Sequence, residues 1–408
     1  MTRQMKDSGV EWLGEIPFNW NTIRLKFLSK ISTGNGDTKD KVIDGKYPFF
    51  VRSQTVEYLN DYTHDEEAIL TAGDGAGVGK VFHHYIGKFS AHQRVYIFNG
   101  FSKNIFPRFL FYYIQSNLNK VVNLGEAKST VDSIRLPMLT EFPVVLPCLE
   151  EQIQISNKLD KIIDIIDSAI LETQQSIEEL KKYKQSLITE VVTKGLDENI
   201  EMKDSGVEWI GKIPLDWEVI NSKRLFGERK EKAYVNDIQL TASQKYGILP
   251  QEEFMKIENQ RVTVVEFNRA ILKHVEPGDF VISMRSFQGG LEYSNVRGCI
   301  SSAYVMLYPK MKIHTGYFKW LFKSLGYISA LQSTSNLIRD GQALRYTNFS
   351  KVPLLNVPYS QQGEISDFLD QKVDSIDKLI DEKELLISEF EQYKKSLIYE
   401  YVTGKKQV

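Results

Sequence analysis

Apolar residues recur at alternating spacings of three and four in two long stretches of the chain. One stretch runs from Leu159 to Val191, and the other runs from Leu369 to Tyr401, 210 positions later. This spacing, with charged residues between the apolar ones, is typical of coiled-coil helices rather than of helices lying on a globular core. The pattern predicts two equivalent helices, each about 50 Å long at ~1.5 Å per residue.

Polar residues interrupt both predicted seams at equivalent places. Thr173 and Lys184 interrupt the first seam, and Lys383 and Lys394 interrupt the second. Such layers either fix the register of a helix pair, or their lysines merely extend along its edge into water. The sequence leaves both alternatives open. The apolar seam positions are Leu159, Ile163, Ile166, Ile170, Ile177, Leu180, Leu187 and Val191, then Leu369, Val373, Ile376, Ile380, Ile387, Phe390, Leu397 and Tyr401.

A second repeat precedes each variable part of the chain. Residues 5–17, MKDSGVEWLGEIP, return at 202–214 as MKDSGVEWIGKIP, and Trp20 and Trp217 keep the same offset of 197. Self-similarity at long period indicates two equivalent halves, each built as leader, domain and long helix. The leader's turn residues around Trp12 predict an irregular clip held by that tryptophan, with a structural role favoured over a binding one. By symmetry, the first leader should lie near the end of the second helix.

The pattern divides the chain into residues 1–145 and 195–357, two domains with their leaders, and residues 146–194 and 358–408, two spacer helices. Within the domains, alternating apolar runs predict strands, and longer periodic runs predict helices. The expected class is therefore α+β, with two mixed α/β domains. The first domain has expected strands at 47–51, 68–71 and 94–98, and a helix at 107–122. The second has strands at 279–284 and 303–308, and a helix at 317–332; strands at 142–147 and 352–358 lead into the spacers.

Three paired motifs carry a family resemblance over the whole chain. They are the leader with its tryptophan, the junction LPCLEEQIQI with VPYSQQGEI, and the helix end KYKQSLITEVVTKG with QYKKSLIYEYVTGK. At these residues the chain resembles the specificity subunits of type I restriction-modification systems. SQKYGILP and NLIRDGQALRYTNF also resemble one class of recognition domain. The second junction departs from the acidic pattern, with Ser360, Gln361 and Gln362 where the first has Glu150, Glu151 and Gln152.

The resemblance implies two target recognition domains, each reading half of a bipartite site in double-stranded DNA, in a pseudo-two-fold arrangement separated by two long antiparallel helices. It also implies two modification subunits that methylate adenine, and restriction subunits that translocate and cut. S-adenosylmethionine, ATP and Mg are then expected in those partners, with no cofactor in this chain. A two-fold relation across DNA would itself make the helices antiparallel, so that their length sets the half-site spacing.

Composition and charge are compatible with this interpretation. The chain has 408 residues, a formal net charge of −2 and two cysteines. Both domains are slightly basic and both helical stretches acidic, an asymmetry that suits a polyanionic partner or simply a solvated surface. No run is long and apolar enough for a membrane span, and residues 1–10 lack a signal-peptide core, so we expect a cytoplasmic protein with no membrane partner.

Signals for catalysis are weak. The glycine run from Gly73 to Lys80 lacks the phosphate-loop spacing, because Asp74 and Val81 stand at the required Gly and Ser/Thr positions; a loop between strands is favoured. His83 and His84 are adjacent, so they should point to opposite sides of a strand and share no metal. Neither an adenine methyltransferase motif nor a nuclease cluster is present. We therefore expect a non-catalytic chain with no metal site.

Loop residues that can reach base edges or phosphates are the DNA-binding candidates. Each of them could also be ordinary solvated surface. The alternative function is a protein-interaction scaffold, which would show no salt-dependent DNA binding. The candidates are Arg52, Ser53, Gln54, Lys80, Lys128, Ser129 and Thr130 in the first domain, and Ser243, Gln244, Lys245, Tyr246, Arg285, Gln288, Arg339, Gln342 and Arg345 in the second.

Overall fold

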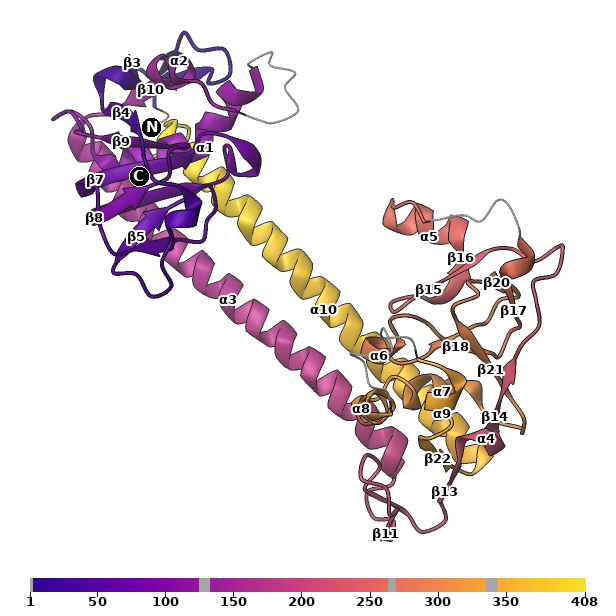
Figure 1. The fold of residues 1–408 in the computed structure, drawn as a ribbon. Helices are drawn as coiled ribbons and strands as arrows, with labels where there is room; N and C mark the ends of the chain where they lie inside the picture. Colours follow the sequence, from indigo (N-terminus) through magenta and orange to yellow (C-terminus); the bar gives the residue numbers. More distant parts are fainter. Residues whose placement is uncertain (1–2, 125–132, 263–268, 335–343) are drawn as a thin grey trace. The chain divides into compact units, whose positions relative to one another are not determined.

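The structure is a computed structural model that describes residues 3–124, 133–262, 269–334 and 344–408. The chain forms two compact units (Figure 1). Unit 1 comprises Met1–Gln174 and Glu384–Val408, and unit 2 comprises Gln175–Lys383. Each unit therefore holds one domain, the first part of one long helix and the last part of the other. Both strands and helices occur in each unit, so the α+β class is confirmed.

Unit 1 is built on a six-stranded sheet of order β4-β9-β7-β8-β5-β6, in which only the pairing of β5 with β8 is parallel. Two smaller antiparallel pairs, β1 with β2 and β3 with β10, hold the leader and the domain's last strand. The strands are β1 Met5–Asp7, β2 Glu15–Pro17, β3 Asn21–Arg24, β4 Lys30–Thr33, β5 Tyr47–Phe50, β6 Glu57–Leu59, β7 His64–Ala72, β8 Phe82–Ala91, β9 Val95–Asn99 and β10 Pro143–Leu146; the helices are α1 Pro107–Leu124 and α2 Leu136–Thr140.

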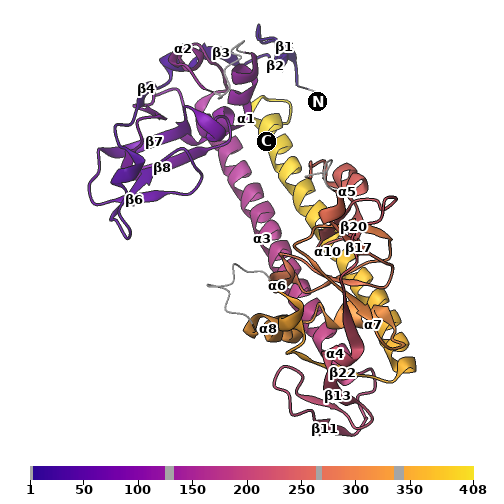
Figure 2. The same ribbon diagram turned by 45° about the vertical axis from the view of Figure 1, so that its right-hand side comes forward.

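Helix α1 lies between the sheet and the long helices of unit 1 (Figure 2). Its apolar residues Phe109, Tyr113 and Leu118 are fully buried in one core together with Leu159 and Leu397 of the two long helices. Because large side chains of this kind each contribute a few kcal/mol by leaving water, this core joins the domain to its helix pair.

Unit 2 uses a different set of sheets. Four strands are ordered β14-β21-β18-β19, and four two-stranded pairs surround them. The strands are β11 Met202–Asp204, β12 Lys212–Pro214, β13 Glu218–Asn221, β14 Phe226–Arg229, β15 Leu240–Ser243, β16 Gly247–Pro250, β17 Lys273–Val275, β18 Phe280–Ile282, β19 Glu292–Tyr293, β20 Gly298–Ile300, β21 Val305–Pro309 and β22 Pro353–Asn356. The helices are α4 Ser222–Leu225, α5 Gln251–Glu258, α6 Ser286–Gly289, α7 Thr315–Leu321, α8 Leu325–Ser333 and α9 Tyr346–Phe349.

The predicted single helix at 317–332 is wrong, because the structure has two helices there. Between α7 and α8, Ser324 has an extended backbone, with φ −71° and ψ 143°, and its hydroxyl accepts a hydrogen bond from the backbone N–H of Tyr327. This is the conformation of an N-cap residue, which starts a new helix. The other strands and helices expected inside the two domains are confirmed with shifted ends.

The two long helices are α3 Leu149–Lys194 and α10 Tyr359–Val402, of 46 and 44 residues. All the predicted seam positions are buried or half-buried. In unit 1, Lys158 lies over the ring of Tyr401, and Asp167 pairs with Lys394, so α3 and α10 run antiparallel there. The coiled-coil prediction is thus confirmed within this unit.

Lysines in the predicted polar layers form ion pairs between the helices. In unit 2, Lys184 Nζ lies 2.5 Å from Asp377 Oδ1, and in unit 1, Lys394 Nζ lies 2.5 Å from Asp167 Oδ1. Both lysines and both aspartates are 210 positions apart, so the second pair repeats the first with the helices exchanged. Of the two alternatives, the register-fixing role is the one these contacts support.

Trp20 and Trp217, which follow the two leaders, each contact both long helices of their own unit and act as clamps. Trp20 is fully buried, donates from Nε1 to Glu151 Oε2 at 2.9 Å, and faces Gly404 just after α10. The leader is a short hairpin of β1 and β2 rather than the predicted irregular clip, and Trp12 stacks on Phe142 with ring centroids 6.1 Å apart, which supports the structural role. The predicted position of the first leader beside the end of α10 is confirmed, because a Cβ at Gly404 would lie 2.4 Å from Pro17 Cγ. Trp217 repeats this arrangement in unit 2, donating to Gln361 Oε1 at 2.6 Å and facing Gly195 just after α3.

Candidate nucleic-acid interface

In unit 1, the loop after β5 packs against the glycine turn after β7. Arg52 Nη1 donates to Asp74 Oδ1 at 2.7 Å, and Arg94, just before β9, donates to the other oxygen of the same carboxylate. A Cβ at Gly77 would lie 2.4 Å from the Arg52 carbonyl oxygen, so only glycine allows this approach. The predicted loop between two strands is confirmed. Its Asp74 carboxylate accepts hydrogen bonds from two guanidinium groups, those of Arg52 and Arg94.

The Asp74 carboxylate stays ionised between its two arginines. Partial burial raises its pKa, but the hydrogen bonds from Arg94 and Arg52 outweigh this effect and hold the pKa below its usual value. Its side chain is 18% exposed, whereas those of Arg52 and Arg94 are 43% and 59% exposed. Two positive groups on one negative group leave the cluster with a net positive charge toward solvent.

The other first-domain candidates differ in how far they are engaged. Ser53 Oγ donates to the Thr55 carbonyl at 2.9 Å, and the Gln54 amide lies 3.5 Å from the Phe82 carbonyl, so both help to shape the loop. Lys80, at the end of the glycine turn, is exposed. Lys128, Ser129 and Thr130 lie outside the described residues.

His83 and His84 occupy opposite faces of β8, as predicted. The His83 ring contacts the Ser53 carbonyl at 3.3 Å, and the His84 ring contacts Glu67 at 2.8 Å. Burial lowers the pKa of both imidazoles. They therefore support the loop and the sheet separately and do not form a joint site.

In unit 2, the tip of the β15–β16 hairpin docks onto the segment around α6. Ser243 Oγ accepts from the backbone N–H groups of Lys245 and Tyr246 at 3.3 Å each, which makes it a turn residue. The Gln244 amide donates to the Arg285 carbonyl at 3.4 Å, and Tyr246 donates to Glu258 at 2.8 Å. Sequence candidates from two separate stretches are thus brought together.

The tip of this hairpin lines a cleft of mixed charge. Within unit 2, Lys245 and Gln288 line a cleft of about 1040 Å³ whose lining also includes Asp370, Asp377 and Asp381 of α10. Lys184 pairs with Asp377, and Lys319 pairs with Asp370, so most of this charge is compensated within the lining. Lys245 itself lies over the Tyr246 ring, with its Nζ 5.1 Å from the ring centroid.

Arg285 and Arg345 are the second-domain candidates best placed to meet a ligand. Arg285 directly precedes α6 and Arg345 directly precedes α9; both are exposed, and neither forms an ion pair within the part of the chain that the structure describes. Arg339 and Gln342 lie outside the described residues.

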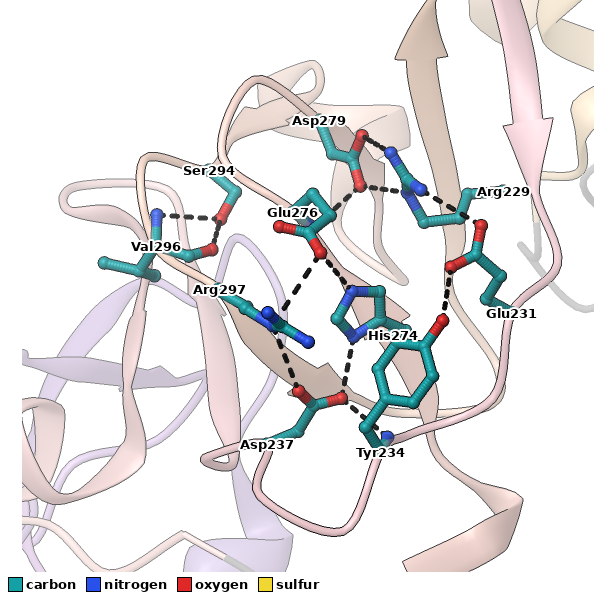
Figure 3. A network of polar contacts seen from close by, with 10 residues as sticks. All are labelled: Arg229, Glu231, Tyr234, Asp237, His274, Glu276, Asp279, Ser294, Val296 and Arg297. Carbon is teal, nitrogen blue, oxygen red and sulfur yellow. Dashed lines mark hydrogen bonds and ion pairs between the residues drawn. The ribbon is translucent and has the colours of Figure 1, made fainter.

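A buried polar network joins loops of the second domain (Figure 3). The fully buried His274 ring contacts Asp237 through Nδ1 and Glu276 through Nε2, both at 2.7 Å. Burial lowers the His274 pKa, but the two carboxylates outweigh it and raise the pKa above its usual value. The exposed Arg297 closes the network, with Nε 3.7 Å from an oxygen of each carboxylate.

Arg94 and Arg297 are absent from the sequence candidates, although both are exposed arginines held by carboxylates. Arg94 begins a strand that is predicted from its apolar residues, and this position indicates a sheet residue rather than a binding residue. The signal that could have identified it is its place beside Gln93 at the start of that strand. In the sequence, Asp74 indicates only a mismatch to a phosphate loop, because its pairing with residues 22 and 20 positions away has no local signature.

Among the residues that the structure describes, none of the His, Cys, Asp and Glu side chains gather in a group of three or more suited to a metal ion. The same described residues contain no helix with the length and apolar character needed to cross a membrane.

Comparison with known proteins gives consistent matches. Residues 17–182 match the type I restriction modification DNA specificity domain. The type I restriction enzyme EcoDI specificity subunit of Escherichia coli is 34% identical over 176 residues, which cover 43% of this chain and 38% of that protein. The putative type I restriction enzyme MjaX specificity subunit of Methanocaldococcus jannaschii is 25% identical over 430 residues, covering 97% of this chain and 96% of that protein.

A solved structure matches the fold over nearly the whole chain. A chain from a study of complex assembly and conformational transition in the type I R-M system has a TM-score of 0.69 at 14% identity, and the match covers 96% of this chain and 99% of that one. The repeated leader, the paired helix junctions and these matches agree: residues 17–182 match the type I restriction modification DNA specificity domain, and the chain as a whole is similar to type I restriction enzyme specificity subunits.

Proposed function

We propose that this chain reads a bipartite site in double-stranded DNA, with one half-site recognised by each domain. The observation that carries the proposal is the repeated joint: Trp20 and Trp217 form equivalent clamps, while the domains attached to them have different sheets. A common frame with two unlike domains suits a protein that presents two specificities. The similarity to specificity subunits supports a non-catalytic role for the chain, with the chemistry carried out by partner subunits.

The proposed partners are two modification subunits that methylate adenine and restriction subunits that translocate and cut. S-adenosylmethionine, ATP and Mg would be bound by those subunits. The clamps around Trp20 in unit 1 and Trp217 in unit 2 are equivalent, so each unit offers the same kind of surface to a partner. This equivalence supports two copies of the modification subunit.

The test is to co-express the chain with its modification subunit in a host that lacks adenine methylation, and to map methylated adenines across the genome. The expected result is a split motif with a fixed gap and one methylated adenine on each strand. Exchanging residues 20–145 for those of another specificity subunit should change one part of the motif only. An assembled complex that methylates no defined motif, and shows no salt-dependent DNA binding, would favour the protein-scaffold function instead.

A further inference from the structure

We propose that Arg52 and Arg94 form a guanine-reading pair in the first domain, and that Asp74 is the positioning residue that holds both. This inference rests on the proposed DNA-reading function and names the base that one of its surfaces recognises. Arg52 comes from the loop after β5, Arg94 from the start of β9 and Asp74 from the glycine turn, so three separate segments build the pair.

The hydrogen bonds to Asp74 leave the Nε and Nη2 edge of each guanidinium group available to a ligand. Both guanidinium groups donate to Asp74 through Nη1. In the described part of the chain, neither Arg52 nor Arg94 has a hydrogen bond from Nε or Nη2. Two neighbouring N–H groups of an arginine match the O6 and N7 acceptors of guanine in the major groove, whereas adenine places a donor at the O6 position.

The turn keeps this edge accessible and pre-arranged. A side chain at Gly75 would begin 3.6 Å from Arg52 Nη1 and would start to cover the guanidinium. Asp74 limits the rotamers of both arginines before any DNA arrives, which reduces the ordering cost of binding. Lys80, exposed at the other end of the turn, suits a phosphate contact that positions DNA without selecting a base.

A purely structural ion pair is the competing explanation. One arginine would be enough to neutralise Asp74, yet two are present, and both are more than two-fifths exposed. Ion pairs at this exposure add little stability. The two explanations therefore differ in what each arginine should control: base preference in one case, and only loop stability in the other.

The experiment uses the complex with the modification subunit and genome-wide mapping of methylated adenines. R52A and R94A should each lower the preference for guanine at one position, within the half-site assigned to residues 20–145, by roughly 5- to 150-fold. D74N should weaken the same positions to a smaller extent. The other half-site should be unchanged. R24A is the matched control, because Arg24 is an exposed arginine of the same unit that pairs with Glu141 at 2.9 Å; its motif should equal that of the wild type.

R52K and R94K test the inference in case the alanine variants fail to fold. Lysine keeps the positive charge but cannot donate the two parallel hydrogen bonds of a guanidinium group. Both lysine variants should show the same base-specific loss in a complex that still assembles. A wild-type split motif that all four arginine variants leave intact would overturn this inference alone. So would a first half-site without guanine on either strand. Absence of any motif from the assembled wild-type complex would overturn both this inference and the proposed function.

Discussion

Glu151 and Gln361 occupy equivalent positions at the starts of the two long helices, yet each is matched to different neighbours. Glu151 accepts from Trp20 and pairs with Arg3 at 2.7 Å. Gln361 accepts from Trp217 and uses its amide to donate to Asp216 at 2.9 Å. The exchange of acid for amide is therefore compensated inside each joint. The departure from the acidic family pattern leaves the clamp itself intact.

Because the chain packs closely around Trp20, alanine substitution should destabilise it by different amounts at two glycines with similar backbone angles. Gly9 and Gly404 have φ values of +71° and +73°, but a Cβ at Gly9 meets nothing within 4 Å, whereas one at Gly404 would lie 2.4 Å from Pro17 Cγ and 3.1 Å from Trp20. G9A should cost about 1–2 kcal/mol from the left-handed backbone alone. G404A should cost a further ~1–3 kcal/mol from overpacking. Urea unfolding of both variants checks this, and equal losses would contradict the clamp.

Among the elements, those with local signals were predicted and those set by distant contacts were not. Heptad spacing located α3 and α10, because a coiled-coil seam repeats along one helix. The break between α7 and α8 was missed, although Ser324 is a good N-cap, since the apolar periodicity continues through it. The strands of the leader hairpin, β1 and β2, are three residues each and were too short to stand out from the turn residues around them.

The interhelical ion pairs predict that opposite charges help to fix the register of α3 against α10. K184D should place two negative groups together in unit 2, whereas K184D combined with D377K should restore the attraction seen at 2.5 Å. Because these side chains are partly exposed, the coupling energy should be only about 0.2–1 kcal/mol. A double-mutant cycle by thermal unfolding measures it. The same cycle at Lys394 and Asp167 is the internal control, and zero coupling at both pairs would leave the lysines without a role in register.

The His274 network predicts a pH dependence confined to the loops that it joins. The pKa of His274 is raised in the folded chain, so its stabilising contribution is complete below the unfolded pKa of about 6.5 and is lost as the pH rises through the higher folded value. The charged groups that face it are Asp237, Glu276 and Arg297, and Tyr234 packs on the ring. Protection from hydrogen exchange at 273–276, measured relative to the intrinsic exchange rate at each pH, should therefore fall over that pH range.

The variant H274Q isolates this effect. Other histidines act in the opposite sense: burial lowers the pKa of His83, His84 and His92, so the stability that they affect is lost as the pH falls. The protection of residues 273–276 from hydrogen exchange is measured against pH for the wild type and for H274Q. Subtracting the H274Q values from the wild-type values removes the contribution of the other histidines. A difference that does not decline with rising pH would refute the ionised form of His274.

For the whole molecule, the sequence predicts the organisation in two halves. It does not predict the chemistry of the candidate DNA-binding loops. Candidate loops were located because they follow strands. Their environments depend on the rest of the unit: Lys245 shares a cleft with α10 carboxylates, while Arg52 is held open by Asp74. A sequence pattern does not reveal these environments, since the α10 carboxylates of the cleft are more than a hundred positions from Lys245 and Asp74 is 22 positions from Arg52.

Separate cores predict separate control of the two half-sites. The larger apolar cluster of unit 1 includes Trp20, and that of unit 2 includes Trp217, with no residue in common. R285A and R345A should therefore relax one part of the methylated motif, by ~1–3 kcal/mol for a lost base contact, and leave the part read by unit 1 unchanged. Combining R285A with R94A should add the two effects, because the two arginines share no partner and belong to units with separate cores. Circular dichroism should show unchanged helix content. Loss of both motif parts from R285A alone, in a folded complex, would mean that the domains do not read DNA independently.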